Sequence, residues 1–228
     1  NDITSLNINI TPFLGLNSCQ LKELSIYGNP VNSLILQNTE NLELLNVRGT
    51  YLSQLDVYNY PYVSSLDISY TAIESIDLSS NLFLRDLSFG GEFINSSGDW
   101  QLSPMNSIEI ISYEGMDISY YGGLLVNLDL SNVLGYSDIS IDCNVLQCIN
   151  LANGTNGNWD GSFLWGDVYG SLGYNADYGL PPPPPLCIQV DDVNIANTLW
   201  VGNFDVDHPD YTFSTDCGDC SGTSNLTE

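Results

Sequence analysis

Apolar residues recur between Leu21 and Phe89 in one short phrase, apolar-x-x-apolar-x-apolar. The central positions of successive phrases lie alternately 10 and 11 residues apart, and they are Leu24, Leu34, Leu45, Leu55, Leu66, Ile76 and Leu87. The positions three residues before and two residues after each of them are also apolar. The alternation that ends each phrase is typical of a half-buried strand.

One 10-residue and one 11-residue spacing together define a 21-residue unit that holds two short strands. A single unit cannot bury its own apolar face, so we expect successive units to stack and to share one core. The pattern therefore predicts a mainly β fold, a solenoid with short strands on both sides of each coil. Asn29, Thr50 and Thr71 follow at the same 21-residue interval, and we expect them to turn inward and bond the backbone of neighbouring coils.

The repeat resembles a known family. The stretch LKELSIYGNPVNSL at 21–34 is similar to the leucine-rich repeat pattern LxxLxIxxNxVxxL, and ISIDCNVLQCINL at 139–151 is a second copy. The 21-residue length, with LDIS and LDLS in alternate halves, resembles the repeats of surface and secreted proteins from Bacteroidota. The resemblance covers most of residues 3–151, although Thr replaces the family's Asn in two units. It implies a leucine-rich-repeat solenoid.

The C-terminal part carries a second resemblance. CIQVDDVNIANTLW followed by FSTDC, at 187–217, is similar to the terminal segment of the same bacterial repeat proteins. That resemblance implies a segment that closes the solenoid, with a disulfide between Cys187 and Cys217.

Two interruptions break the repeat. Residues 90–106 separate Phe89 from the next phrase, IEIISY, and a larger break separates Ile149 from Ile188 by several times the usual spacing. Insertions in repeat proteins are often functional. We therefore divide the chain into a solenoid (1–152), an insertion rich in Gly, aromatic residues and Pro (153–186), a closing repeat (187–220) and a tail (221–228).

The larger insertion combines glycines with aromatic side chains, a composition that suits an adaptable binding loop or a small satellite core. Aromatic faces also suit the apolar sides of sugar rings. Arg48 lies on an outward strand position, where it either compensates the charge of Asp67 or contacts a ligand. The candidate ligand-binding residues are Tyr27, Arg48, Trp100, Trp159, Trp165, Tyr169, Tyr174 and Tyr178.

Charge narrows the range of partners. The chain has 3 Lys and Arg against 28 Asp and Glu, a formal net charge of −25. Nucleic acids and anionic membranes bind clustered cations, so neither is an expected partner. No apolar run reaches the ~18 residues of a membrane-spanning helix. Asp205, Asp207 and Asp210 offer oxygen ligands for Ca²⁺, but their spacing matches no complete calcium loop, and no other cofactor is expected.

Six cysteines and few lysines favour an extracellular or outer-surface location. If Cys187 bonds Cys217 and Cys143 bonds nearby Cys148, then Cys19 and Cys220 remain without a partner among the other cysteines. They would lie at opposite ends of a straight solenoid, much farther apart than the two Cα atoms of a disulfide can be. They are then either free or bonded to another chain.

These features favour a non-enzymatic binding or adhesion protein that recognises a protein or a glycan through the repeat face and the aromatic insertion. A catalytic Ser-His-Asp or Cys-His set would have to use the single histidine, His208, and no nucleophile in the sequence lies in a recognisable turn motif. An alternative is a structural subunit that stacks end to end into an extracellular filament or sheath. A further alternative is a glycan-cleaving enzyme that uses paired carboxylates.

Overall fold

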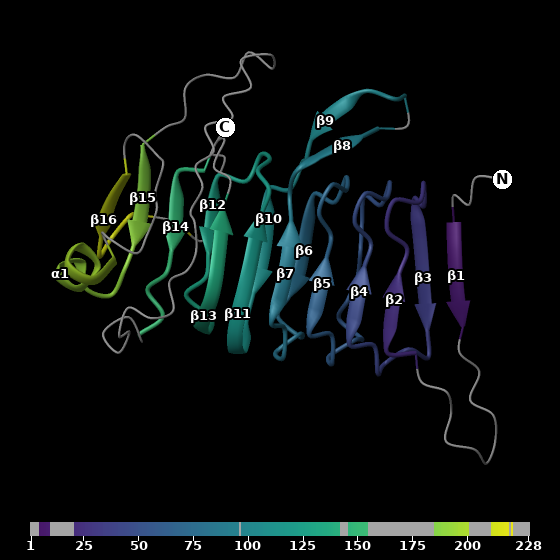
Figure 1. Cartoon of the computed structure of the whole chain (residues 1–228), viewed down its shortest axis with the longest axis horizontal. Coiled ribbons are helices and arrows are strands. Elements are labelled where there is room, and N and C mark those ends of the chain that lie inside the picture. Colours follow the sequence, from purple (N-terminus) through teal and green to yellow (C-terminus); the bar gives the residue numbers. More distant parts are fainter. Residues whose placement is uncertain are drawn as a thin grey trace.

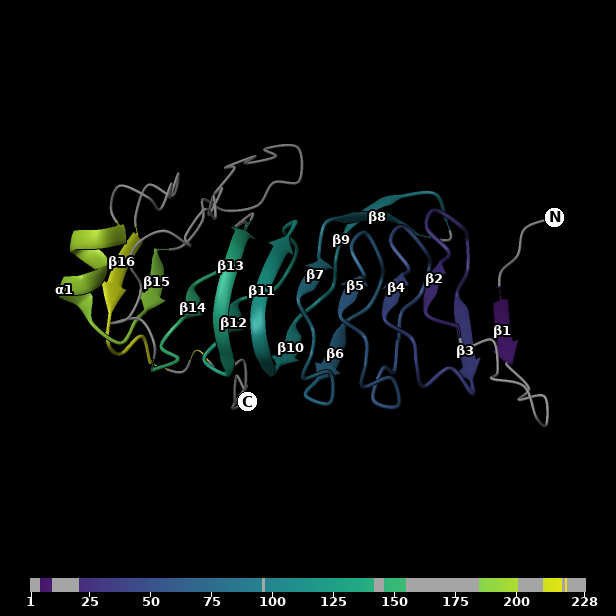
Figure 2. The ribbon, with the colours of Figure 1, turned by 60° about the horizontal axis from the view of Figure 1, so that its bottom comes forward.

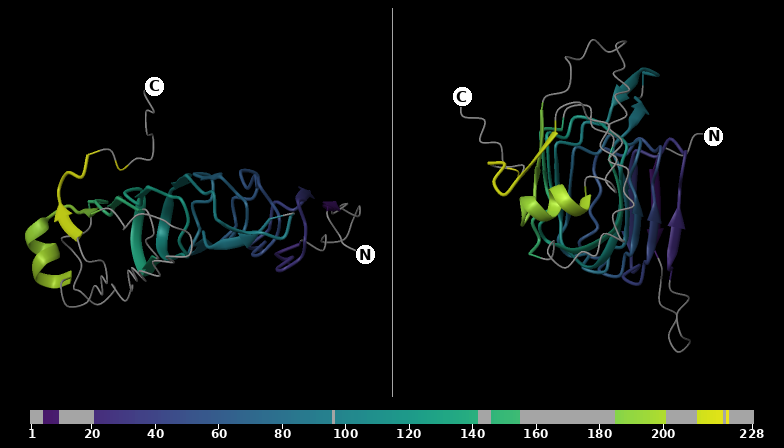
Figure 3. Two further views of the ribbon diagram at one scale, coloured as in Figure 1. Left: turned by 90° about the horizontal axis from the view of Figure 1, so that it is seen from above. Right: turned by 60° about the vertical axis from the view of Figure 1, so that its left-hand side comes forward.

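A computed structural model describes residues 5–9, 21–95, 97–141, 146–154, 185–200, 211–218 and 220. The protein is mainly β, and its strands stand side by side in an elongated row with β1 (Ser5–Asn9) at one end (Figure 1). A short helix, α1 (Val193–Ile195), lies at the other end and continues into a π-helical turn, Ala196–Trp200 (Figure 3). No helix in these ranges is long and apolar enough to cross a membrane.

The largest sheet has six parallel strands in the order β13-β11-β7-β5-β4-β2. Their bounds are β2 Glu23–Ser25, β4 Leu44–Asn46, β5 Ser65–Asp67, β7 Asp86–Phe89, β11 Ser112–Tyr120 and β13 Val133–Ile141. The register places Leu24 beside Leu45, Leu45 beside Leu66, and Leu66 beside Leu87. The 21-residue interval in the sequence is therefore the interval between neighbouring strands.

The other sheets are smaller. A four-stranded parallel sheet contains β12 (Asn127–Asp129), β14 (Cys148–Asn150), β15 (Leu186–Gln189) and β16 (Tyr211–Ser214). Two parallel pairs join β1 with β3 (Ser33–Gln37) and β6 (Ser75–Leu78) with β10 (Ser107–Ile110). One antiparallel hairpin joins β8 (Glu92–Ile94) to β9 (Trp100–Leu102).

The apolar repeat positions form the core. All of them between 21 and 89 belong to one hydrophobic cluster or pack against it, and the half-buried ones are Leu21, Leu24, Leu34, Leu36 and Leu55. The cluster continues through the later strands to Ala196. The sequence prediction of the core positions is confirmed.

The polar residues after the strands support the turns. Thr50 and Thr71 are buried, and each hydroxyl donates to the carbonyl three residues earlier, Val47 or Ile68, at 2.7 Å. Asn29 makes the equivalent bond to Ile26 but is exposed. The prediction that the threonine side chains point inward is confirmed. The carbonyls that they bind, however, belong to the same unit and not to the neighbouring one. Asn81 does reach the neighbouring unit, since it donates to the Tyr60 carbonyl at 2.8 Å.

One predicted strand is absent. Residues 51–57, around Leu55, form no strand, so β3 and β6 are not joined into one sheet. Side chains bind backbone carbonyls in this part of the protein. The Tyr60 hydroxyl donates to the Leu36 carbonyl at 2.9 Å, and Asn81 donates to the carbonyls of Tyr60 and Val57.

Both interruptions of the repeat leave the register intact. Leu87 pairs with Ile118, and the additional residues between them include the β8–β9 hairpin. Ile149 pairs with Ile188 across the larger insertion. The residues before and after each interruption therefore belong to strands that pair directly with each other.

Two disulfide bonds hold the C-terminal sheet. Cys187 bonds Cys217, as the family resemblance implies, with 5.8 Å between their Cα atoms. The predicted bond between Cys143 and Cys148 is wrong, because Cys148 bonds Cys220 with 5.5 Å between Cα atoms. The stacking of β14, β15 and β16 brings this distant cysteine close, so Cys220 is neither free nor available to another chain. Disulfide bonds fit an extracellular protein.

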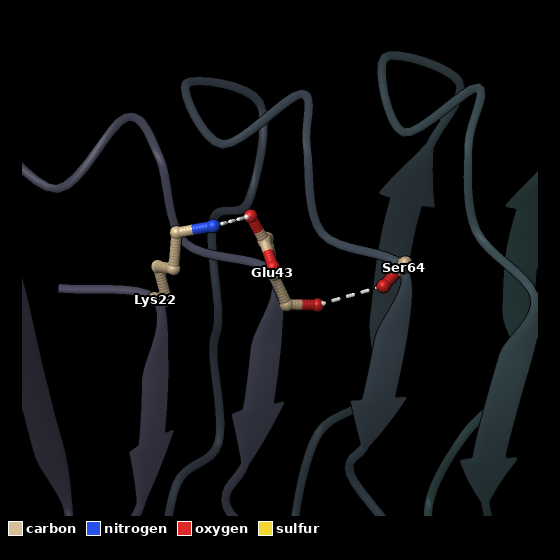
Figure 4. A network of polar contacts seen from close by, with 3 residues as sticks. All are labelled: Lys22, Glu43 and Ser64. Atoms are coloured by element: carbon tan, nitrogen blue, oxygen red, sulfur yellow. Dashed lines mark hydrogen bonds and ion pairs between the residues drawn. The ribbon is translucent and has the colours of Figure 1, made fainter. Parts of the chain in front are cut away.

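A row of polar side chains crosses the six-stranded sheet at the residues that directly precede β2, β4 and β5 (Figure 4). The Lys22 Nζ atom lies 2.5 Å from Oε1 of Glu43, and the Ser64 hydroxyl donates to the Glu43 carbonyl at 3.2 Å. These residues recur at 21-residue intervals, so the repeat aligns polar as well as apolar side chains.

Leu66 lies at the centre of the core and is 1% exposed. We expect Leu66→Asp to cost more than about 4 kcal/mol and to unfold the protein, because it buries a carboxylate without a partner. Ser75→Asp adds the same charge at an exposed position of β6 and should leave the melting temperature nearly unchanged. A folded Leu66→Asp protein with the melting temperature of the parent would contradict the assigned core.

Two surface carboxyls should respond oppositely to pH. Burial and the carboxylate of Asp117 raise the pKa of Asp86 above its ordinary value, and Arg85 lowers it in part. Hydrogen bonds from the Ser79 side chain and backbone lower the pKa of Asp77. The ionised form is therefore unfavourable in the fold at position 86 and favourable at position 77.

At pH 7 we expect Asp86→Asn to raise the free energy of unfolding and Asp77→Asn to lower it, each by about 0.5 kcal/mol or less, and the melting temperature should shift in the same direction. The fold disfavours ionised Asp86, and this cost disappears as pH falls below the ordinary pKa of about 4. The stability that Asp77 contributes is lost as pH falls through its lowered pKa. Thermal unfolding between pH 3 and 7 should show both differences shrinking with acid, and equal shifts of one sign would contradict the assignment.

Candidate functional site

The turns that follow the strands of the large sheet form a regular column. Gly28, Gly49, Tyr70 and Gly91 lie at 21-residue intervals, and each has a positive φ, of 68°, 65°, 57° and 90°. Their backbones remain in register, because Gly28 N–H donates to the Arg48 carbonyl and Tyr70 N–H to the Gly90 carbonyl, at 2.9 and 2.7 Å. Side chains in these turns therefore lie side by side.

Tyr70 is the exception in this column of glycines. A positive φ costs a residue with a side chain about 1 kcal/mol, and a bulky residue adopts it rarely. The Tyr70 ring packs against Gly91, where an added Cβ would lie 2.8 Å from a ring carbon, and against the Tyr121 ring at 5.5 Å between centroids. Backbone strain that the surroundings maintain in this way often marks a functional position.

Arg48 lies among tyrosine rings. Its guanidinium carbon is 4.5 Å from the centroid of Tyr70, 5.7 Å from that of Tyr121 and 6.0 Å from that of Tyr27. Such cation–π contacts are worth about 0.5–2 kcal/mol and hold the guanidinium in place. Arg48 makes no ion pair with Asp67, whose Oδ1 accepts instead from the Ser69 backbone and hydroxyl at 3.0 and 2.6 Å.

The β8–β9 hairpin covers these turns. Figure 2 shows it running along the ends of the units that contain β2, β4 and β5. Together the hairpin and the turns line a pocket of about 400 Å³ that is open to solvent. Its aromatic lining is Tyr27, Tyr51, Tyr70, Phe93 and Trp100, and its other lining residues are Gly28, Arg48, Gly49, Thr50, Glu92 and Ile94. Tyr27 and Trp100 are 60% and 58% exposed, so their rings remain available to a ligand.

Three of the residues selected from the sequence line this one pocket: Tyr27, Arg48 and Trp100. The sequence placed them in two different strands and an insertion, with nothing to show that they meet. The other candidates lie outside the described residues, and they are Trp159, Trp165, Tyr169, Tyr174 and Tyr178. The Ca²⁺ candidates Asp205, Asp207 and Asp210 lie outside them as well.

Sequence reasoning did not select Tyr51, Tyr70, Phe93 or Glu92. Tyr70 carried a usable signal, because it occupies a repeat position that is glycine in the neighbouring units. The hairpin residues carried none, since their place depends on how the insertion folds back.

Within the described ranges, one group of side chains has the proximity that a metal site requires. The sulfur atoms of Cys148, Cys217 and Cys220 lie within 4.8 Å of one another, but all three belong to the two disulfides. A second hollow, of about 270 Å³, is lined by residues 32–34 and 53–56 and has no aromatic side chain.

Comparison of the chain with protein-family models, with curated proteins and with solved structures finds no match. The pocket itself is therefore the basis for assigning a function.

Two glycines of the column should differ in their tolerance of alanine. Gly28→Ala meets no atom within 4 Å and should cost only the backbone penalty of about 1 kcal/mol. Gly91→Ala pays the same penalty and also pushes against the Tyr70 ring, so we expect a further loss of about 1–3 kcal/mol. Thermal unfolding of both variants checks this, and equal losses would show that Tyr70 does not pack firmly on Gly91.

Proposed function

We propose that this protein is a secreted or cell-surface leucine-rich-repeat protein that binds a glycan without cleaving it. Its parallel sheets would be the two sides of one solenoid. The common 21-residue register, the shared core and the strand pairing across both insertions support this architecture. The two disulfides support an extracellular location.

The observation that carries the function is the aromatic lining of the pocket above the repeat turns. Ligand pockets combine apolar and aromatic walls with a few polar groups that fix orientation. Here five aromatic rings surround a guanidinium and one carboxylate, and the opening leaves the outer rings accessible. Sugar rings present apolar faces that stack on aromatic rings and hydroxyls that hydrogen-bond charged groups, so a glycan matches both parts of this lining.

The carboxylate content of the lining favours binding over cleavage. Most glycosidases use two carboxyl groups that flank the scissile bond. The described residues of the pocket include one, Glu92. We therefore propose recognition, as in adhesion, and we keep the aromatic residues of the larger insertion as a second candidate binding segment.

The filament alternative loses part of its support. Unpaired cysteines at opposite ends, Cys19 and Cys220, would have fitted end-to-end stacking, but Cys220 is bonded to Cys148. Cys19 lies outside the described residues.

A glycan array with the purified chain tests the proposed function, with affinities measured by titration on the best glycan. We expect Tyr27→Ala and Trp100→Ala each to weaken binding about tenfold, or about 1.4 kcal/mol, because each removes a stacking surface. Tyr58→Ala is a matched control: Tyr58 is 65% exposed, holds the place of Tyr27 in the other half of the repeat and lies outside the pocket.

Equal effects of the Tyr27 and Tyr58 substitutions would move the site away from the pocket. Deletion of residues 155–180 separates the two candidate surfaces. If that deletion alone abolishes binding while Trp100→Ala has no effect, the insertion is the site and the pocket is not.

A further inference from the structure

The chain has three cationic side chains, and two of them have anionic neighbours. Lys22 forms an ion pair with Glu43 (Figure 4), and Arg85 acts on the carboxyl of Asp86. Arg48 is the third. No carboxylate of the described residues forms an ion pair with it, although the protein carries 28 acidic residues.

Three tyrosine rings surround the Arg48 guanidinium, but none of them is an acidic partner. Tyr70, Tyr121 and Tyr27 lie at cation–π distances from it, and such contacts leave its positive charge without an anionic partner. The N–H groups of a guanidinium lie in its plane and form a fork that matches a carboxylate or a sulfate. The backbone of Arg48 is paired, since its N–H donates to Asn46 Oδ1 and its carbonyl accepts from Gly28, but its guanidinium donates no hydrogen bond to a described residue.

The charge of Arg48 selects among ligands. A cationic ligand would be repelled by a guanidinium that already lies on the tyrosine rings. A hydrogen bond from a charged donor to a charged acceptor is about twice as strong as one between neutral groups. In a partly enclosed pocket this difference is screened less than on an open surface.

We propose that the pocket recognises an anionic sugar residue, whose carboxylate or sulfate group pairs with the Arg48 guanidinium while its ring stacks on the aromatic lining. This inference rests on the proposed glycan-binding function and narrows its ligand class. Glu92, the carboxylate of the lining, is then available to accept hydrogen bonds from ligand hydroxyls. The net charge of −25 opposes any anion at long range, so the contact with Arg48 has to supply the preference.

Titration of three oligosaccharides of equal length tests the proposal: an oligogalacturonate, a sulfated galactan and a neutral galactan. A chelator in the buffer prevents Ca²⁺ from bridging acidic groups of protein and ligand. We expect one of the two anionic oligosaccharides to bind at least tenfold more tightly than the neutral one, and its identity distinguishes carboxylate from sulfate. Arg48→Gln should reduce that ratio to nearly one, and Arg48→Lys should reduce it partly, because lysine keeps the charge without the fork.

Arg85→Gln is the matched control, since it removes the same charge outside the pocket and should leave the ratio unchanged. Glu92→Gln removes a carboxylate that repels an anionic ligand while its amide oxygen can still accept from ligand hydroxyls, so it should raise the ratio of anionic to neutral affinity. Equal affinities for anionic and neutral oligosaccharides, or a preference that survives Arg48→Gln, would overturn the inference.

The proposed function and the inference fail differently. If neutral glycans bind through Tyr27 and Trp100 as tightly as anionic ones, the pocket is a glycan site and the assignment of an anionic ligand is wrong. If no glycan binds and the aromatic substitutions change nothing, the proposed function itself is wrong.

Discussion

The contact between equivalent apolar side chains on neighbouring strands is the interaction on which the rest of the structure depends. Leu24, Leu45, Leu66 and Leu87 stand next to one another across four parallel strands that are only three or four residues long. A strand of that length is not stable alone, so its position is set by burial against its neighbours. A shift by one residue would turn the apolar set toward solvent. Once this register is fixed, every other position of the repeat is also aligned with its counterparts.

The pocket is a consequence of that alignment. The turns after β2, β4 and β5 are held in step, so Tyr27, Arg48 and Tyr70 lie together although they belong to three successive units of the sequence. At this turn position Gly28 and Gly49 have no side chain and leave space above the turns, whereas Tyr70 in the next unit fills that space with its ring. A rigid repeat surface thus positions the aromatic and cationic groups, and one insertion covers them.

The core could be predicted from the sequence because burial is periodic, and each apolar position of the repeat carries the same information. The missing strand around Leu55 could not, because its apolar pattern equals that of its neighbours, while the carbonyls nearby are bound by Tyr60 and Asn81 from outside the segment. The cysteine pairing failed for a related reason. Closeness in sequence suggested Cys143 for Cys148, but a stacked sheet brings residues of later units, here Cys220, directly alongside. The pocket was predictable only in its parts, since the path of the β8–β9 hairpin depends on contacts that no repeat encodes.

The hairpin also separates ligand contact from core packing, two properties that are usually coupled in a protein. Its residues, 92–102, lie outside the apolar repeat, and the strands on either side pair as though it were absent. Its sequence and length can therefore change without altering the packing of the units beneath. A protein built in this way can acquire a new ligand when a different hairpin replaces this one above an unchanged set of turns.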